Sequence, residues 1–173
     1  RHTAQQWIFG SVLDNLLERS GKMVLVTNLL SPLNSMSRII AVIPPNAEFE
    51  TGFTHWINTL RTLARQTAAK VVFHGNPSTL SHLKQTLEDA AMKIDAEHAI
   101  FNDWDNFVKF SDDIKADDLL VVISARKGSV SHNSVLDHIP RQLGKHFIDV
   151  SFVVIYPEQI GTEEYSDVSL MNR

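Results

Sequence analysis

Apolar runs and amphipathic segments alternate along most of this chain. Short, mostly apolar segments predict five strands, at residues 38–43, 70–74, 97–101, 117–124 and 151–156. The continuous β-branched run at residues 38–43 is typical of a strand buried on both faces of a parallel sheet. Because helical segments separate the strands, the expected fold class is α/β: a doubly wound, five-stranded parallel sheet joined by right-handed crossovers.

Apolar residues at helical spacing predict the intervening helices. One of them starts with Asn76 as the N-cap and Pro77 in the first turn. Its expected buried face is Leu80, Leu83, Leu87, Ala90, Ala91 and Ile94. Asp103 is expected to cap a helix that carries Trp104, Phe107, Val108 and Ile114. A last helix is expected over residues 134–146, where Pro140 requires a late start or a kink.

A helix and a short strand precede this five-stranded unit. Gly10-Ser11 opens the helix, Gly21 ends it, and residues 23–26 form the strand. Two such elements cannot bury their apolar faces alone, so we expect them to dock on the five-stranded unit. Residues 138–154 repeat the same layout of helix, turn and strand, which is typical of an internal repeat.

The repeat predicts how the chain is divided. Residues 1–30 are expected to be the end of a first repeat, and residues 31–37 a linker that contains turn formers and a proline. Residues 38–157 are expected to form a complete second repeat, followed by a polar tail over residues 158–173.

Composition and charge exclude several classes of partner and site. The formal net charge of −4 argues against nucleic acid as the main partner, because phosphate binding favours a basic face. The chain has no cysteine, which excludes disulfides and thiolate metal sites. Its apolar runs are too short to span a bilayer, and no cluster of Lys or Arg indicates binding to an anionic membrane surface. We therefore expect a soluble, cytosolic chain.

Candidate catalytic groups are scattered. The eight histidines do not have the spacing of a zinc motif. Ser124 follows a strand, but the Gly-x-Ser-x-Gly sequence of a nucleophile elbow is absent. The carboxylate pairs Asp112-Asp113 and Asp117-Asp118 are interpreted as solvated caps rather than as an acid and base pair. The sequence therefore predicts no catalytic residues and no metal site.

Several segments resemble the universal stress protein family of five-stranded, adenine-nucleotide-binding α/β domains. These are Gly10-Ser11 with the helix and strand after it, and the strands at residues 38–43 and 118–123. Within that family, residues 9–19, the Pro-Leu-Asn linker at 32–34 and residues 43–48 resemble the tandem cytosolic C-terminal regions of bacterial sodium/proton antiporters. This resemblance implies a membrane exchanger domain in the same polypeptide and a location on the cytoplasmic side of the bacterial inner membrane.

The resemblance also implies a pairing of strands. Stress proteins pair through their last strands, so the two strands expected to meet here are Met23, Val24, Leu25 and Val26 with Phe152, Val153, Val154 and Ile155. The contact would form within the chain, as a pseudo-dimer, or between the two copies of a homodimer. Either pairing would cover two exposed strand edges.

In nucleotide-binding stress proteins the loop after the fourth strand carries Gly, two residues, Gly, nine residues and then Gly-Ser. The matching positions here are Ala125, Gly128 and His138-Ile139, so only Gly128 is kept. In one interpretation a weak, degenerate anion site remains for ATP or a cyclic dinucleotide, formed by Arg126, Lys127, Gly128, Ser129 and Ser131. In the other, which we favour, these residues form a solvated surface loop, and no cofactor is expected.

The sequence supports three hypotheses about function. The first is a non-catalytic regulatory or assembly domain in the cytosolic tail of a sodium/proton antiporter. The second is a sensor for an adenine nucleotide or cyclic dinucleotide at the Gly128 loop. The third, a hydrolase on the same scaffold, ranks last because no nucleophile, base or metal set converges.

Overall fold

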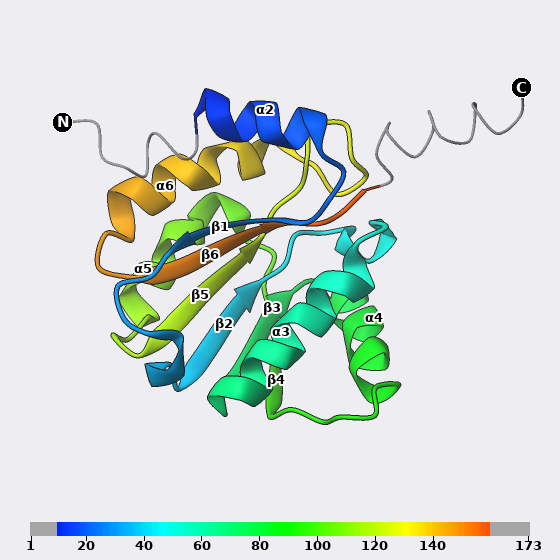
Figure 1. Ribbon diagram of the computed structural model, residues 1–173, viewed down its shortest axis with the longest axis vertical. Helices are drawn as coiled ribbons and strands as arrows, with labels where there is room; N and C mark the ends of the chain where they lie inside the picture. Colours follow the sequence, from blue (N-terminus) through cyan, green and yellow to red (C-terminus); the bar gives the residue numbers. More distant parts are fainter. Residues whose placement is uncertain (1–9, 160–173) are drawn as a thin grey trace, which may run out of the picture.

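A computed structural model describes residues 10–159, which form an α/β fold around one six-stranded sheet (Figure 1). The sheet order is β1-β6-β5-β2-β3-β4. The strands are β1 (Val24–Asn28), β2 (Arg38–Val42), β3 (Lys70–Gly75), β4 (Ala96–Ile100), β5 (Asp118–Ile123) and β6 (Ser151–Tyr156). All neighbours are parallel except β1, which pairs antiparallel with β6. The mostly parallel α/β sheet is confirmed, and β1 makes it six-stranded and mixed.

Five α-helices in the described residues cover the two faces of the sheet (Figure 1). They are α2 (Ser11–Arg19), α3 (Phe53–Thr67), α4 (Pro77–Glu88), α5 (Phe110–Asp113) and α6 (Ile139–His146). One apolar core lies beneath α3 and α4, with Trp56 and Phe73 at its centre. The other lies beneath α2, α5 and α6, with Phe107 and Phe147 at its centre. Strands β5 and β6 are buried over their whole length, which explains their continuous apolar sequence.

The helix limits differ in part from those expected. Asn76 caps α4 as predicted, since its side chain accepts a hydrogen bond of 2.7 Å from the backbone N–H of Thr79. The helix ends at Glu88, however, so the prediction that Ala90, Ala91 and Ile94 extend its apolar face is wrong. Residues 89–95 form an irregular connection to β4, in which Ile94 still packs against the core.

Two other expected helices begin with 3₁₀ segments. Trp104–Lys109 is a 3₁₀ segment followed by the single turn of α5, because the buried Trp104 and Phe107 pack inward. Ser134–His138 is also a 3₁₀ segment, and α6 starts only at Ile139, with Pro140 in its first turn. This is the late start that the proline required.

The α2–β1 unit is docked on the rest of the fold. In the β1–β6 register, Leu25 lies opposite Ile155 and Val26 opposite Val154. Leu13 of α2 is buried in the same core as Leu143 of α6. The unit thus extends the sheet beyond β6 and places α2 beside α6. Across residues 10–159, no helix has the length and apolar character needed to cross a bilayer.

Candidate functional site

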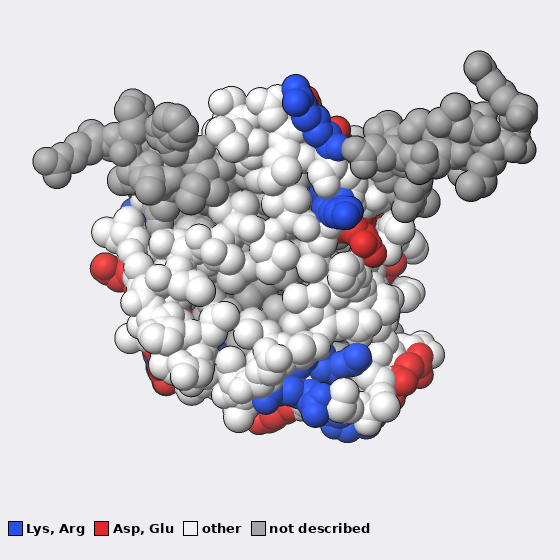
Figure 2. All heavy atoms as spheres, viewed as in Figure 1, with Lys and Arg blue, Asp and Glu red and all other residues white. Residues whose placement is uncertain are grey.

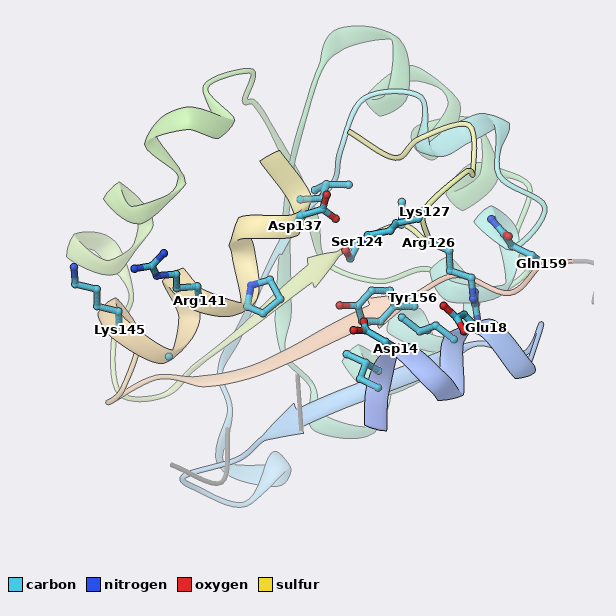
Figure 3. A pocket seen from close by; sticks show the side chains of 16 residues that line it. Asp14, Glu18, Ser124, Arg126, Lys127, Asp137, Arg141, Lys145, Tyr156 and Gln159 are labelled. Carbon is cyan, nitrogen blue, oxygen red and sulfur yellow. The ribbon is translucent and has the colours of Figure 1, made fainter. Parts of the chain in front are cut away.

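A groove of about 1040 Å³ lies between α2 and α6, next to the ends of β5 and β6 (Figure 3). Its apolar lining comes from Leu13 and Leu17 of α2 and from Leu136. Ser124, directly after β5, and Tyr156, the last residue of β6, contribute hydroxyl groups. The groove therefore lies near the carboxyl ends of two neighbouring strands, where ligands bind in open α/β sheets.

The two helices give the groove walls of opposite charge. Asp14 and Glu18 line it from α2, and Arg141 and Lys145 line it from α6. Within residues 10–159, no ion pair includes any of these four side chains. In Figure 3, Asp14 lies beside Tyr156, whereas Arg141 and Lys145 extend from α6 on the opposite side of the view. The two helices thus contribute opposite charges, while Asp137, Arg126 and Lys127 add charges of both signs from the segments between them.

Tyr156 is a neutral hydrogen-bonding group in the groove. Burial raises its pKa to about 12, while a hydrogen bond with Ser124 acts in the opposite direction. The nearby carboxylates of Asp14 and Asp137 also raise this pKa, and the Arg126 guanidinium lowers it. The described lining includes no histidine that would act as a base for the Ser124 hydroxyl.

Arg126 is turned into the protein. It is only 8% exposed, and its Nη1 donates to the backbone carbonyl of Pro157. Its Nη2 donates to the carbonyl of Ser20 at 3.1 Å and to that of Lys22 at 2.5 Å. Burial lowers the pKa of Arg126, and the charge of Glu50 partly offsets that shift. The guanidinium therefore joins the loop after β5 to the turn between α2 and β1 and to the chain leaving β6.

The Glu50 carboxylate accepts hydrogen bonds from the loop after β5. Its Oε1 accepts hydrogen bonds from the Ser131 backbone N–H at 2.9 Å and from the Ser131 hydroxyl at 2.6 Å. Its Oε2 accepts a third from the Gln159 amide at 3.3 Å. Glu50 comes from the loop after β2, and Ser131 from the loop after β5. Strands β2 and β5 flank the switch point of the sheet, so the Glu50 carboxylate lies at the end of the sheet where ligands commonly bind in open α/β folds.

The chain that leaves β6 closes this end of the molecule. The Gln159 N–H donates to the Gly21 carbonyl at 2.6 Å, and the Glu158 carboxylate lies 3.1 Å from Nδ1 of His55. A Cβ on Gly52 would come within 2.6 Å of the Glu158 backbone nitrogen. Glycine at position 52 thus permits residues 157–159 to cross the N-terminus of α3.

The five loop residues proposed from the sequence have different partners in the structure. Lys127 lines the groove, and Gly128 adopts a positive φ of 83° with open space around it. The Ser129 hydroxyl donates to the Arg126 carbonyl at 2.7 Å, while Arg126 and Ser131 have the partners described above. Nucleotide binding by these five residues stays a prediction.

The strand residues singled out from the sequence lie together at one side of the sheet. Val24, Leu25 and Val26 belong to β1, and Met23 directly precedes it. Residues 152–155 belong to β6, and the pairing runs from Val24 with Tyr156 to Asn28 with Phe152. Both strands come from the same chain, so this contact is intramolecular.

Sequence reasoning missed Glu50, Tyr156 and the two acids of α2 as site residues. Their spacing offers no signal, because each reaches the site only through the pairing of β1 with β6 or of β2 with β5. Within residues 10–159, no group of three or more His, Asp or Glu side chains could hold a metal ion.

No family model matches the chain, and no significant match to a curated protein was found.

Proposed function

We propose that this chain is a non-catalytic regulatory and assembly domain of the universal stress protein type, located in the cytosolic tail of a bacterial sodium/proton antiporter. The transporter context rests on the resemblance of residues 9–19 and 43–48. In this proposal the exchange chemistry belongs to a membrane domain of the same polypeptide on the cytoplasmic side of the inner membrane.

One observation carries the proposal: Arg126 joins three separate segments through hydrogen bonds to carbonyls. Arg126 lines the groove and also holds the turn between α2 and β1. In this proposal, a ligand or partner in the groove would therefore change how firmly the α2–β1 unit is held. A ligand or partner shifts such an equilibrium only by binding one arrangement better than the other. A regulatory role therefore needs no catalytic residue in this domain.

The test is sodium/proton exchange by the full-length polypeptide in inside-out vesicles. We expect Arg126→Ala to shift the pH or sodium dependence of exchange, because the α2–β1 unit loses its connection to the loop after β5. Arg65→Ala is the matched control, since Arg65 is an exposed arginine on α3 that does not line the groove. Equal profiles for wild type and Arg126→Ala, at equal expression, would contradict a regulatory role.

The second candidate is a sensor for an adenine nucleotide or cyclic dinucleotide, and the volume of the groove beside Lys127 favours it. A ligand at a hundredfold excess over its dissociation constant stabilises a protein by about 2.7 kcal/mol. Thermal unfolding with ATP, AMP and cyclic di-AMP would show this as a raised midpoint. A rise that Lys127→Ala abolishes would favour the sensor, and no rise would count against it.

A further inference from the structure

Donors from two distant segments hold the turn between α2 and β1. Three successive backbone carbonyls in this turn, those of Ser20, Gly21 and Lys22, each accept a hydrogen bond. Arg126 donates to the first and the third, and the Gln159 N–H donates to the second at 2.6 Å. Carbonyls at the end of a helix have no partner within that helix, so these donors fix how α2 continues into β1.

Residues 157–159, which we call the clasp, connect this turn to α3. The Glu158 carboxylate lies 3.1 Å from Nδ1 of His55, in the first turn of α3, and the Gln159 side chain donates to Oε2 of Glu50 at 3.3 Å. Figure 2 shows basic and acidic side chains gathered near the end of β6, whereas the centre of this face carries none. Because α2 and α3 cover different cores, the clasp joins the two helical layers across the end of the sheet.

The contacts of the clasp are polar and few. They are hydrogen bonds and one ion pair, and neither apolar core of residues 10–159 includes a residue of the clasp. A segment held in this way opens locally at a lower free energy than the core strands do. The clasp therefore has a route to an open state in which both cores stay packed.

Closure of the clasp depends on the missing side chain of Gly52. A Cβ at this position would lie 2.6 Å from the Glu158 backbone nitrogen. The φ of Gly52 is −86°, which other residues adopt without strain, so the backbone conformation does not require glycine here. A substitution at position 52 thus acts on the closed clasp through the space that its side chain occupies.

The clasp also borders the groove. Gln159 and Arg126 line it together with Leu13 and Leu17 of α2. In Figure 3, Gln159 and Arg126 lie on one side of the view, next to the end of β6. A molecule in this part of the groove would touch both the clasp and the helix that the clasp holds. Such a molecule shifts the clasp only if it binds the open and closed states with different affinity.

We propose that residues 157–159 are a releasable clasp that controls the docking of the α2–β1 unit. In the closed state the clasp supplies the donor to Gly21 and the Pro157 carbonyl that orients Arg126. In the open state both contacts are lost, and the α2–β1 unit separates more readily from β6 and from the groove. The effect of the clasp on ion exchange rests on the regulatory role proposed above, whereas its opening does not.

The experiment is thiol labelling of the full chain, which has no cysteine of its own. Val26→Cys places one thiol on β1, where Val26 is 6% exposed, and Val122→Cys places one on the central strand β5. We expect Gly52→Ala to raise the labelling rate of Val26→Cys at least about fivefold, because opening then breaks at least one hydrogen bond fewer. The labelling rate of Val122→Cys should rise less, since β5 is exposed only by global unfolding.

Two further variants isolate the clasp. Gly75→Ala is the matched control, because a Cβ there meets no atom closer than 3.6 Å, and it should change neither labelling rate. Gln159→Pro removes the N–H that binds the Gly21 carbonyl and leaves α3 unchanged, so it should also speed the labelling of Val26→Cys.

Three results would overturn the clasp: unchanged labelling of Val26→Cys in both Gly52→Ala and Gln159→Pro, equal acceleration at Val26→Cys and Val122→Cys, or the same acceleration by Gly75→Ala. Sodium/proton exchange by the full-length polypeptide separates this proposal from the regulatory role. Selective labelling of β1 without a change in exchange removes only the regulatory role. A change in exchange by Arg126→Ala with unchanged labelling in both clasp variants removes only the clasp.

Discussion

Arg126→Ala is the most informative single substitution. It removes the donors to the carbonyls of Ser20, Lys22 and Pro157. A hydrogen bond from a charged donor contributes about 1.5 to 3 kcal/mol. Water replaces part of this at Ser20 and Lys22, which are half-buried and exposed, but not at the buried Pro157. We therefore expect the free energy of unfolding to fall by about 3 kcal/mol, well below three full contributions.

Urea unfolding measures the fall in the free energy of unfolding caused by Arg126→Ala, and amide hydrogen exchange shows in which elements the stability is lost. Protection should fall first in α2 and β1, because Arg126 holds the turn between them, while β2 and β5 keep theirs. Arg126→Lys should be more stable than Arg126→Ala but less stable than wild type. It keeps the positive charge, but its compact ammonium lacks the planar fork with which the guanidinium reaches several carbonyls. A loss below about 1 kcal/mol, or a loss of protection spread evenly over the sheet, would refute this account of Arg126.

Three further predictions concern buried or half-buried ionisable groups. Glu50→Ala should cost about 2 to 3 kcal/mol in urea unfolding, since it leaves the buried Ser131 N–H without an acceptor, whereas Glu50→Gln keeps one and should cost less. In a Tyr165→Phe background, tyrosinate absorbance should report Tyr156 with a pKa of about 12 in the folded protein, and a titration near 10 would contradict its burial. The unfolded state loses this proton first, so the free energy of unfolding should fall by about 2.7 kcal/mol as the pH rises from about 10 to 12. Burial lowers the pKa of His74, so the unfolded state binds the proton more readily than the folded state does. The thermal midpoint should therefore fall as the pH is lowered below about 6.5, and His74→Phe should make that fall smaller.

Strands β2, β5 and β6 were predictable because they are buried almost throughout and form continuous apolar runs, whereas β4 is half-buried and carries Glu97 and His98. The helices were less predictable where buried aromatic side chains determine the backbone conformation. Asn106, between the buried Trp104 and Phe107, has a φ of −107° and a ψ of 26°, which interrupts regular helical geometry. Apolar spacing alone does not distinguish that 3₁₀ segment from an α-helix.

The site was less predictable than the fold. A basic residue in a Ser-rich loop is ordinarily solvated, and nothing local indicates that Arg126 turns inward. Its acceptors lie more than a hundred residues earlier, at Ser20 and Lys22, or about thirty later, at Pro157. Glu50 gave no signal either, because its partner Ser131 is 81 residues away.

Residues 157–159 make contacts out of proportion to their number. They supply an acceptor for Arg126, a donor for Glu50 and a donor for Gly21. A truncation directly after Tyr156 would remove all three at once while keeping every described strand of the sheet. Mechanical tension applied to the chain beyond β6 would reach these same contacts before it reached either apolar core. Force applied at the C-terminal side would therefore reach α2 and β1 first through residues 157–159, which lie outside any helix or strand.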